Sequence, residues 1–174
     1  MEKAIIEKVK KGDTKAFKKL YDDNVQSLYR FLFQFSGNRY IVEDWVQTTF
    51  IKAYKNIDRF EYKSKFSTWL FSIGLNEMRS YFRNKSNLKT VSFDDIYMDE
   101  PLLEEEAFEW QEDMRWLLSE LDEDKKAVFI LFEVEGFSHS EVSQILNISE
   151  ASSRTTLSRT KQYLKQRWQA EMTK

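Results

Sequence analysis

The sequence predicts an all-α fold of two small helical domains joined by an acidic linker, and three observations lead to this prediction. Glycine occurs 4 times and proline once in 174 residues, whereas sheet proteins need such residues at frequent turns. Apolar residues recur at helical spacing through most of the chain. Charge is distributed very unevenly. Together these features place the domains at residues 1–85 and 114–174, with the linker at 86–113.

The charge pattern separates the three parts. Residues 1–85 carry 17 basic and 10 acidic residues, and residues 86–113 carry one basic residue against ten acidic ones. Residues 114–174 carry nine of each, and six of these nine basic residues lie from Arg154 onward. The acidic middle buries little, which is typical of a tether. A second interpretation adds that this anionic strand occupies cationic grooves meant for nucleic acid.

Composition excludes several functional classes. Cysteine is absent, which excludes a disulfide framework, a thiolate zinc site and a thiol nucleophile. His139 is the single histidine, which argues against a histidine-rich metal site or a Ser-His-Asp triad. No apolar run reaches about 18 residues, the length that spans a membrane, and the N-terminus lacks a signal-peptide core. We therefore expect a cytoplasmic protein with no catalytic residue, metal, cofactor, small-molecule substrate or membrane insertion.

The first domain is expected to contain a short N-terminal helix and three longer ones. The Gly12-Asp13 pair separates the first two, and Asp13 or Thr14 can cap the second. The second stripe continues to the break at Ser36-Gly37-Asn38. The third helix is expected over about residues 39–57 and the fourth over about 67–85.

The segment between the third and fourth helices alternates aromatic and basic residues. Cations meet phosphates and aromatic faces stack unpaired bases, so this pattern favours binding of single-stranded nucleic acid. The competing interpretation makes Phe60, Phe66 and Trp69 core anchors with solvated lysines between them. The candidate nucleic-acid ligands of this segment are Arg59, Phe60, Tyr62, Lys63, Lys65, Phe66 and Trp69.

The C-terminal domain follows a helix-turn-helix pattern. Ser138 to Glu141 forms a capping box that starts a short helix, with His139 as a solvated residue inside it. Asn147 to Ser149 turns into a final helix that reaches about Trp168. Two helices joined by so tight a turn are typical of DNA binding. Ser153, Leu157, Thr160, Leu164 and Trp168 are expected to face inward. The candidate DNA ligands on the outer face are Ser152, Arg154, Thr155, Ser158, Arg159 and Gln162.

Three ordered motifs resemble the extracytoplasmic-function (ECF) group of bacterial RNA polymerase sigma factors. Residues 44–54 carry an Asp-x-x-Gln-x-x-Phe pattern similar to the family's region-two helix. Residues 66–76 (Trp-Leu…Ile…Asn) are similar to its promoter-melting stretch, and residues 121–161 to its region four. The resemblance covers nearly the whole chain apart from the acidic middle. It implies a region-2-like bundle and a region-4-like helix-turn-helix.

The resemblance also implies partners and roles. A helix bearing Asp44, Gln47, Phe50 and Tyr54 would dock on the clamp helices of core RNA polymerase, and the polymerase flap is a further expected contact. The 59–69 segment and the helix bearing Asn76, Arg79 and Arg83 would open the −10 element of promoter DNA. The last helix would read the −35 element. The linker would thread through the nascent-RNA channel, and an anti-sigma factor is an expected partner.

Two other functional classes are alternatives to a sigma factor. A stand-alone helix-turn-helix regulator, with the first domain as a sensor or dimerisation module, would bind DNA without polymerase and would not bind single strands. A helical enzyme would need a paired acid/base site or a metal shell, and the sequence offers neither. The aromatic and basic segment at residues 59–69 favours a factor that binds unpaired bases. The sequence leaves the relative placement of the two domains open.

Overall fold

A computed structural model describes residues 1–87 and 112–173, so most of the acidic linker lies outside the described residues. Every regular element in the described part is helical, which confirms the all-α prediction. The N-terminal domain consists of α1 (Glu2–Lys10), α2 (Thr14–Phe33), α3 (Arg39–Lys55), the 3-10 turn η1 (Ile57–Arg59) and α4 (Phe66–Asn87). The C-terminal domain consists of α5 (Glu112–Ser119), α6 (Glu123–Phe129), the π-helical segment η3 (Ile130–Val134), α7 (His139–Leu146) and α8 (Glu150–Met172).

Side-chain caps set where the N-terminal helices begin. The Asp13 carboxylate accepts hydrogen bonds from the backbone N–H groups of Lys15 and Ala16, both at 3.0 Å, and so starts α2. Asn38 does the same for α3. Gly12 has a φ of 88°, a left-handed conformation that glycine adopts without strain, and it turns the chain from α1 into α2.

Helices α2, α3 and α4 surround the core of the N-terminal domain. Leu28, Phe31 and Leu70 are completely buried between them. The helices approach closely at Gly74 in α4, where an added Cβ would lie 2.9 Å from Leu28 Cδ1. The buried Thr49 hydroxyl donates to the Trp45 carbonyl at 2.6 Å, so this polar group is satisfied within α3.

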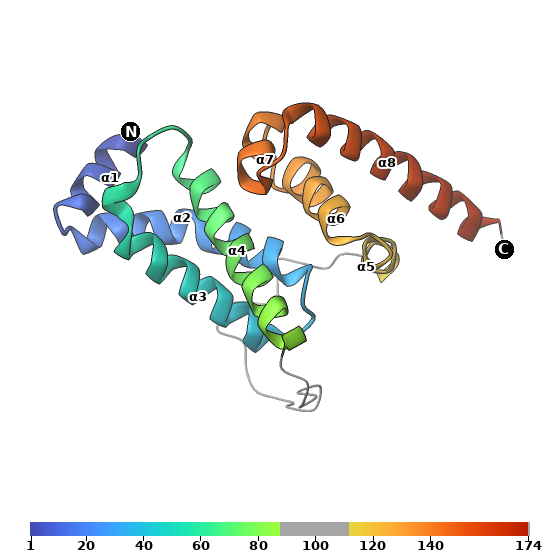
Figure 1. Ribbon diagram of the computed structural model, residues 1–174, viewed down its shortest axis with the longest axis horizontal. Helices are drawn as coiled ribbons and strands as arrows, with labels where there is room; N and C mark the ends of the chain where they lie inside the picture. The colour runs from blue at the N-terminus through green and yellow to red at the C-terminus, as the bar shows by residue number, and fades with distance from the viewer. Residues whose placement is uncertain (88–111, 174) are drawn as a thin grey trace.

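The two domains lie against each other, with α7 of the C-terminal domain packed on α4 of the N-terminal domain (Figure 1). Phe71 on α4 meets Phe137 edge-on, with ring centroids 4.8 Å apart. Buried residues of α6 and α7 belong to the same apolar core as those of α2 to α4. The structure therefore settles the placement that the sequence leaves open, at least for the described residues.

Candidate nucleic-acid and protein interfaces

Helices α7 and α8 form the expected helix-turn-helix. Helix α7 begins with the predicted capping box, in which the Ser138 side chain and the Glu141 carboxylate each bond the other's backbone N–H. It ends at Asn147, whose left-handed φ of 54° reverses the chain. The Ser149 hydroxyl then accepts from the Ser152 N–H at 3.0 Å and caps α8. Only residues 147–149 separate the two helices.

The outer face of α8 is open to solvent as predicted. Ser153, Leu157, Thr160 and Leu164 are buried. The six candidate DNA ligands are all exposed: Ser152, Arg154, Thr155, Ser158, Arg159 and Gln162. Among these candidates, Arg154 pairs with Glu150 at 3.2 Å. Within the part of the chain that the structure describes, Arg159 has no carboxylate partner, so its guanidinium is available to an anion.

The structure corrects one expectation for α8 and refines another for α7. Trp168 is 39% exposed instead of inward-facing, because α8 continues past the end of the core it packs on. His139 is half-buried, with its ring stacked on Phe132 at 4.2 Å and Nδ1 2.8 Å from the Ser153 hydroxyl. His139 thus joins α7 to α8, and this contact gives it a structural role.

The aromatic residues of the 59–69 segment divide into core and surface. Phe60 and Phe66 are buried, as the core-anchor interpretation expects. Trp69 is half-buried and packs against both rings, at 5.2 Å from Phe60 and 6.0 Å from Phe66. Tyr62 stands at the surface side of Phe60, 5.2 Å away. Of these four aromatic rings, only those of Trp69 and Tyr62 are partly exposed.

Tyr62 is held in a specific pose by the first helix. Its backbone has a φ of 59°, and its hydroxyl donates to Glu7 of α1. The Lys3 and Lys10 ammonium groups lie over its ring, at 5.3 and 4.6 Å from the centroid. Desolvation and the Glu7 hydrogen bond raise the pKa of Tyr62 to about 12, so it keeps its proton at neutral pH.

The cations of this segment and of α4 differ in their partners. Lys63 pairs with its neighbour Glu61, and Arg59 is exposed. Lys65 and Arg79 instead pair with carboxylates of the C-terminal domain. Asn76 and Arg83 are exposed on α4. All the predicted polar ligands of this group therefore lie at the surface.

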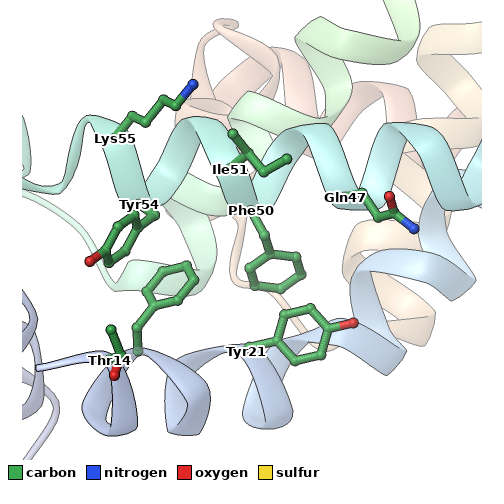
Figure 2. Close-up of a pocket in the computed structure, with 8 residues that line it drawn as sticks. Thr14, Tyr21, Gln47, Phe50, Ile51, Tyr54 and Lys55 are labelled. Atoms are coloured by element: carbon green, nitrogen blue, oxygen red, sulfur yellow. The ribbon is translucent and has the colours of Figure 1, made fainter.

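A groove between α2 and α3 gathers three of the four candidate polymerase contacts. It encloses about 480 Å³, and it is lined by Thr14, Phe17, Tyr21, Gln47, Phe50, Ile51, Tyr54 and Lys55 (Figure 2). Phe50 forms its floor between Phe17 and Tyr21, at ring distances of 6.4 and 4.6 Å. Asp44 is exposed on the same helix but does not line the groove.

Sequence reasoning missed the half of this groove that α2 contributes. Phe17 and Tyr21 fall on the apolar stripe of α2 and read as core residues, yet Tyr21 remains 37% exposed. Ile51 is 52% exposed on α3. Ile51 was the available signal for this groove. It is an apolar residue one helical turn after Gln47, and it lies off the apolar stripe of the helix that builds the core.

A second apolar groove of about 420 Å³ lies on the C-terminal domain. It is lined by Met114, Leu117, Phe129, Lys161, Leu164, Lys165 and Trp168. Two lysines stand beside an apolar floor, and the exposed Trp168 forms part of the wall. The sequence did not predict this groove, although it placed Leu164 and Trp168 on the inward face of the last helix. In residues 1–87 and 112–173 no cluster of three or more potential metal ligands occurs.

Comparison with known proteins defines the class of protein. Residues 20–87 match the model of sigma-70 region 2, and residues 112–164 match that of sigma-70 region 4. The first match spans α2 to α4, and the second runs from α5 into α8, so the two domains are the two promoter-recognition regions of a sigma factor.

Individual relatives narrow the class. The ECF RNA polymerase sigma factor SigX of Bacillus subtilis is 32% identical over 150 residues, covering 80% of this chain and 77% of that protein. SigW of the same organism is 29% identical over 185 residues, covering 95% of both. The sigma factor RpoE of Bartonella quintana, solved with the anti-sigma factor NepR, superposes with a TM-score of 0.71 at 26% identity, over 87% of this chain and 96% of that one.

The chain belongs to the ECF family of RNA polymerase sigma factors. Sigma factors are non-catalytic initiation factors, and this one directs core RNA polymerase to promoter DNA. In the described ranges no helix is long and apolar enough to cross a membrane.

Proposed function

We propose that three surfaces of this sigma factor divide the work of initiation. Helix α8 reads the −35 element, the 59–69 segment with α4 opens the −10 element, and the α2–α3 groove docks on the polymerase clamp helices. The observation that carries the proposal is the outer face of α8, where all six candidate ligands are exposed opposite a buried face. Helix α8 thus has one buried face and one exposed polar face, as expected of a recognition helix that binds in a major groove.

The −10 interface is proposed without Phe60 and Phe66 as stacking residues. Both are buried in the hydrophobic core, so they stabilise the segment and are not available to stack on bases. The remaining candidates are Arg59, Tyr62, Lys63, Lys65, Trp69, Asn76, Arg79 and Arg83. Cations from this set would contact phosphates, and the partly exposed rings of Tyr62 and Trp69 would stack on unpaired bases.

The α2–α3 groove supports the proposed clamp-helix contact through its chemistry. An apolar floor with Gln47 and Lys55 beside it suits an amphipathic helix laid along it. Asp44, one helical turn from Gln47, would extend the contact with a charge. The apolar groove beside Lys161 and Lys165 is the candidate contact for the flap.

Other expectations belong to the proposal as well. We propose that the protein acts in the cytoplasm beside core polymerase, without an enzymatic activity of its own. We also propose control by an anti-sigma factor, which is what the solved relative from Bartonella quintana binds. The expected passage of the linker through the RNA channel concerns residues that lie outside the described part of the chain.

Run-off transcription with purified core polymerase on a promoter library tests the proposal. The complete chain should yield discrete transcripts whose upstream sequences define the two elements. Arg159→Ala should reduce yield through the −35 element, and Trp69→Ala should reduce it on duplex templates more than on pre-opened ones. A chain that occupies duplex sites as a dimer and never starts RNA would instead be a stand-alone regulator.

A further inference from the structure

Charged side chains of the first helix, α1, contact the loop between η1 and α4 at both of its ends and in its middle. Lys3, Glu7 and Lys10 are spaced four and three residues apart, so they share one face of α1. Ile6 and Val9, on another face, are buried in the core and fix α1 on the N-terminal domain. The charged face of α1 is therefore held next to the loop by apolar packing.

The backbone at both ends of the loop is hydrogen-bonded to α1. The Lys10 ammonium donates to the Phe60 carbonyl at 3.0 Å. At the other end, the Glu2 carboxylate accepts from the Phe66 N–H, also at 3.0 Å. Phe66 is the first residue of α4, and the preceding Lys65 has no side-chain oxygen that could cap the helix. Helix α1 thus supplies an acceptor that the residue before α4 lacks, and this bond stabilises the start of α4.

The middle of the loop is held through Tyr62, whose backbone is unusual. Its φ of 59° lies in the left-handed region, which a bulky residue adopts only when the surrounding contacts hold it there. Glu7 supplies one such contact, because its carboxylate accepts the Tyr62 hydroxyl. This hydrogen bond lowers the pKa of Glu7, so the carboxylate is ionised at neutral pH and remains an acceptor. Lys3 and Lys10 add their attraction to the Tyr62 ring.

The position of Tyr62 determines which aromatic surface the loop offers to a base. The Tyr62 ring lies 5.2 Å from Phe60, and Phe60 in turn lies 5.2 Å from Trp69. Tyr62 and Trp69, the two partly exposed rings, therefore both contact one buried ring. A loop whose rings are already oriented binds an unpaired base more tightly than a loop that the base must first order.

We infer that α1 positions the −10 site, with Glu7 holding Tyr62 in the conformation in which its ring can stack on an unpaired base. Glu2 and Lys10 hold the two ends of the same loop. These three residues act through the loop and are positioning residues. The sigma-70 region 2 match begins at residue 20, so α1 lies outside it. The inference rests on the proposed role of the 59–69 segment in promoter opening, and the experiment below tests the two ideas separately.

Two substitutions of Glu7 isolate its hydrogen bond from its charge. Glu7→Ala removes the acceptor, whereas Glu7→Gln keeps an amide oxygen that can accept the Tyr62 hydroxyl. Both remove the same negative charge, so any general electrostatic gain toward DNA is the same in both. Alanine and glutamine are both good helix formers, and Glu7 is exposed, so both variants should fold. A difference between them therefore reports the hydrogen bond to Tyr62.

The state of the loop can be read without DNA from the fluorine NMR spectrum of the full chain labelled with fluorotyrosine. The sequence has 8 tyrosines, and the Tyr62 resonance is the one that disappears in Tyr62→Phe. In the starting protein and in Glu7→Gln this resonance should be displaced from the position of the free amino acid. In Glu7→Ala it should move toward that position. Circular dichroism establishes that each variant keeps its helices.

A binding arm uses fluorescence anisotropy with a labelled single-stranded DNA pool of random sequence. Glu7→Ala should bind about tenfold more weakly than Glu7→Gln if the freed loop occupies the binding conformation about a tenth of the time. In a Tyr62→Phe background the two Glu7 variants should bind equally, because no hydroxyl remains to be held. Trp69→Ala controls for the site itself, and it should weaken binding through loss of a stacking ring.

The outcomes separate the positioning role of α1 from the proposed function of the loop. A Tyr62 resonance that Glu7→Ala leaves unchanged overturns the inference. Equal affinity of Glu7→Ala and Glu7→Gln, with Tyr62 present and binding by Trp69→Ala impaired, overturns the positioning by α1 but leaves the −10 site in place. Full affinity of Trp69→Ala overturns the proposed −10 role of the segment, and the inference with it.

Discussion

Replacing Phe66 by alanine distinguishes the core role of the 59–69 segment from a direct role in promoter opening. Phe66 is fully buried and contacts Phe60 and Trp69. Removing a buried phenylalanine side chain costs about 3–5 kcal/mol, a large part of the roughly 5–15 kcal/mol that stabilises a domain. With a urea dependence of about 2 kcal/mol per molar, the unfolding midpoint should fall by about 2 M.

The assay is urea unfolding followed by circular dichroism, run beside promoter-opening assays at low temperature where the variant remains folded. Phe66→Leu, which keeps most of the apolar volume, should lose far less stability and serves as the control. Trp69→Ala should show the opposite balance, with a smaller loss of stability and a larger loss of opening on duplex DNA. An unchanged midpoint for Phe66→Ala together with lost promoter opening would refute the assignment of Phe66 to the core.

Three further predictions address the other surfaces. Arg159→Ala should weaken −35 binding and reduce the slope of log affinity against log salt by about one, measured by fluorescence anisotropy from low to moderate salt; an unchanged slope would remove Arg159 from the DNA face. Asp44→Ala with Gln47→Ala should lower affinity for core polymerase in a pull-down while leaving the melting temperature unchanged, because both side chains are exposed; equal affinity would place the docking surface elsewhere. Burial opposes ionisation of Glu141, but its bonds to Lys65 and Ser138 lower its pKa below the ordinary 4.5. Its ion pair with Lys65 is therefore present at neutral pH and lost as the pH falls through that lowered pKa, so Glu141→Gln should lower the urea unfolding midpoint more at neutral pH than in acid; an equal effect at both pH values would contradict this.

Local chemistry explains why so much of the fold could be predicted from the sequence. Asp13, Ser138 and Ser149 are strong caps in the right places, and each starts a helix in the structure. The regular stripe on α8 correctly predicted the buried face as far as Leu164, but not at Trp168, which is exposed. The third helix was expected to reach residue 57, but α3 ends at Lys55 and a separate 3-10 turn follows. Boundary residues such as these depend on tertiary contacts that periodicity does not report.

The features that escaped prediction depend on contacts between distant segments. Tyr21 lines the groove only because α2 packs against α3 next to Phe50. No pattern within the α2 sequence predicts this contact. The π-helical segment at Ile130–Val134 adds a widened turn that apolar spacing does not reveal. The sequence suggests that Glu135 is a surface acid, yet its side chain is buried beside Arg30. Local sequence patterns do not reveal this pair, because Arg30 lies 105 positions earlier in the chain. The predicted DNA and polymerase residues remain predictions until binding is measured.

The bond between His139 and Ser153 has a consequence for how this sigma factor moves. It ties the start of α7 to the first turns of α8, on the opposite side of the turn at Asn147. The same α7 is the helix that leans on α4. Because this bond holds the start of α7 to α8, we expect the two helices to keep their relative orientation when α8 contacts DNA.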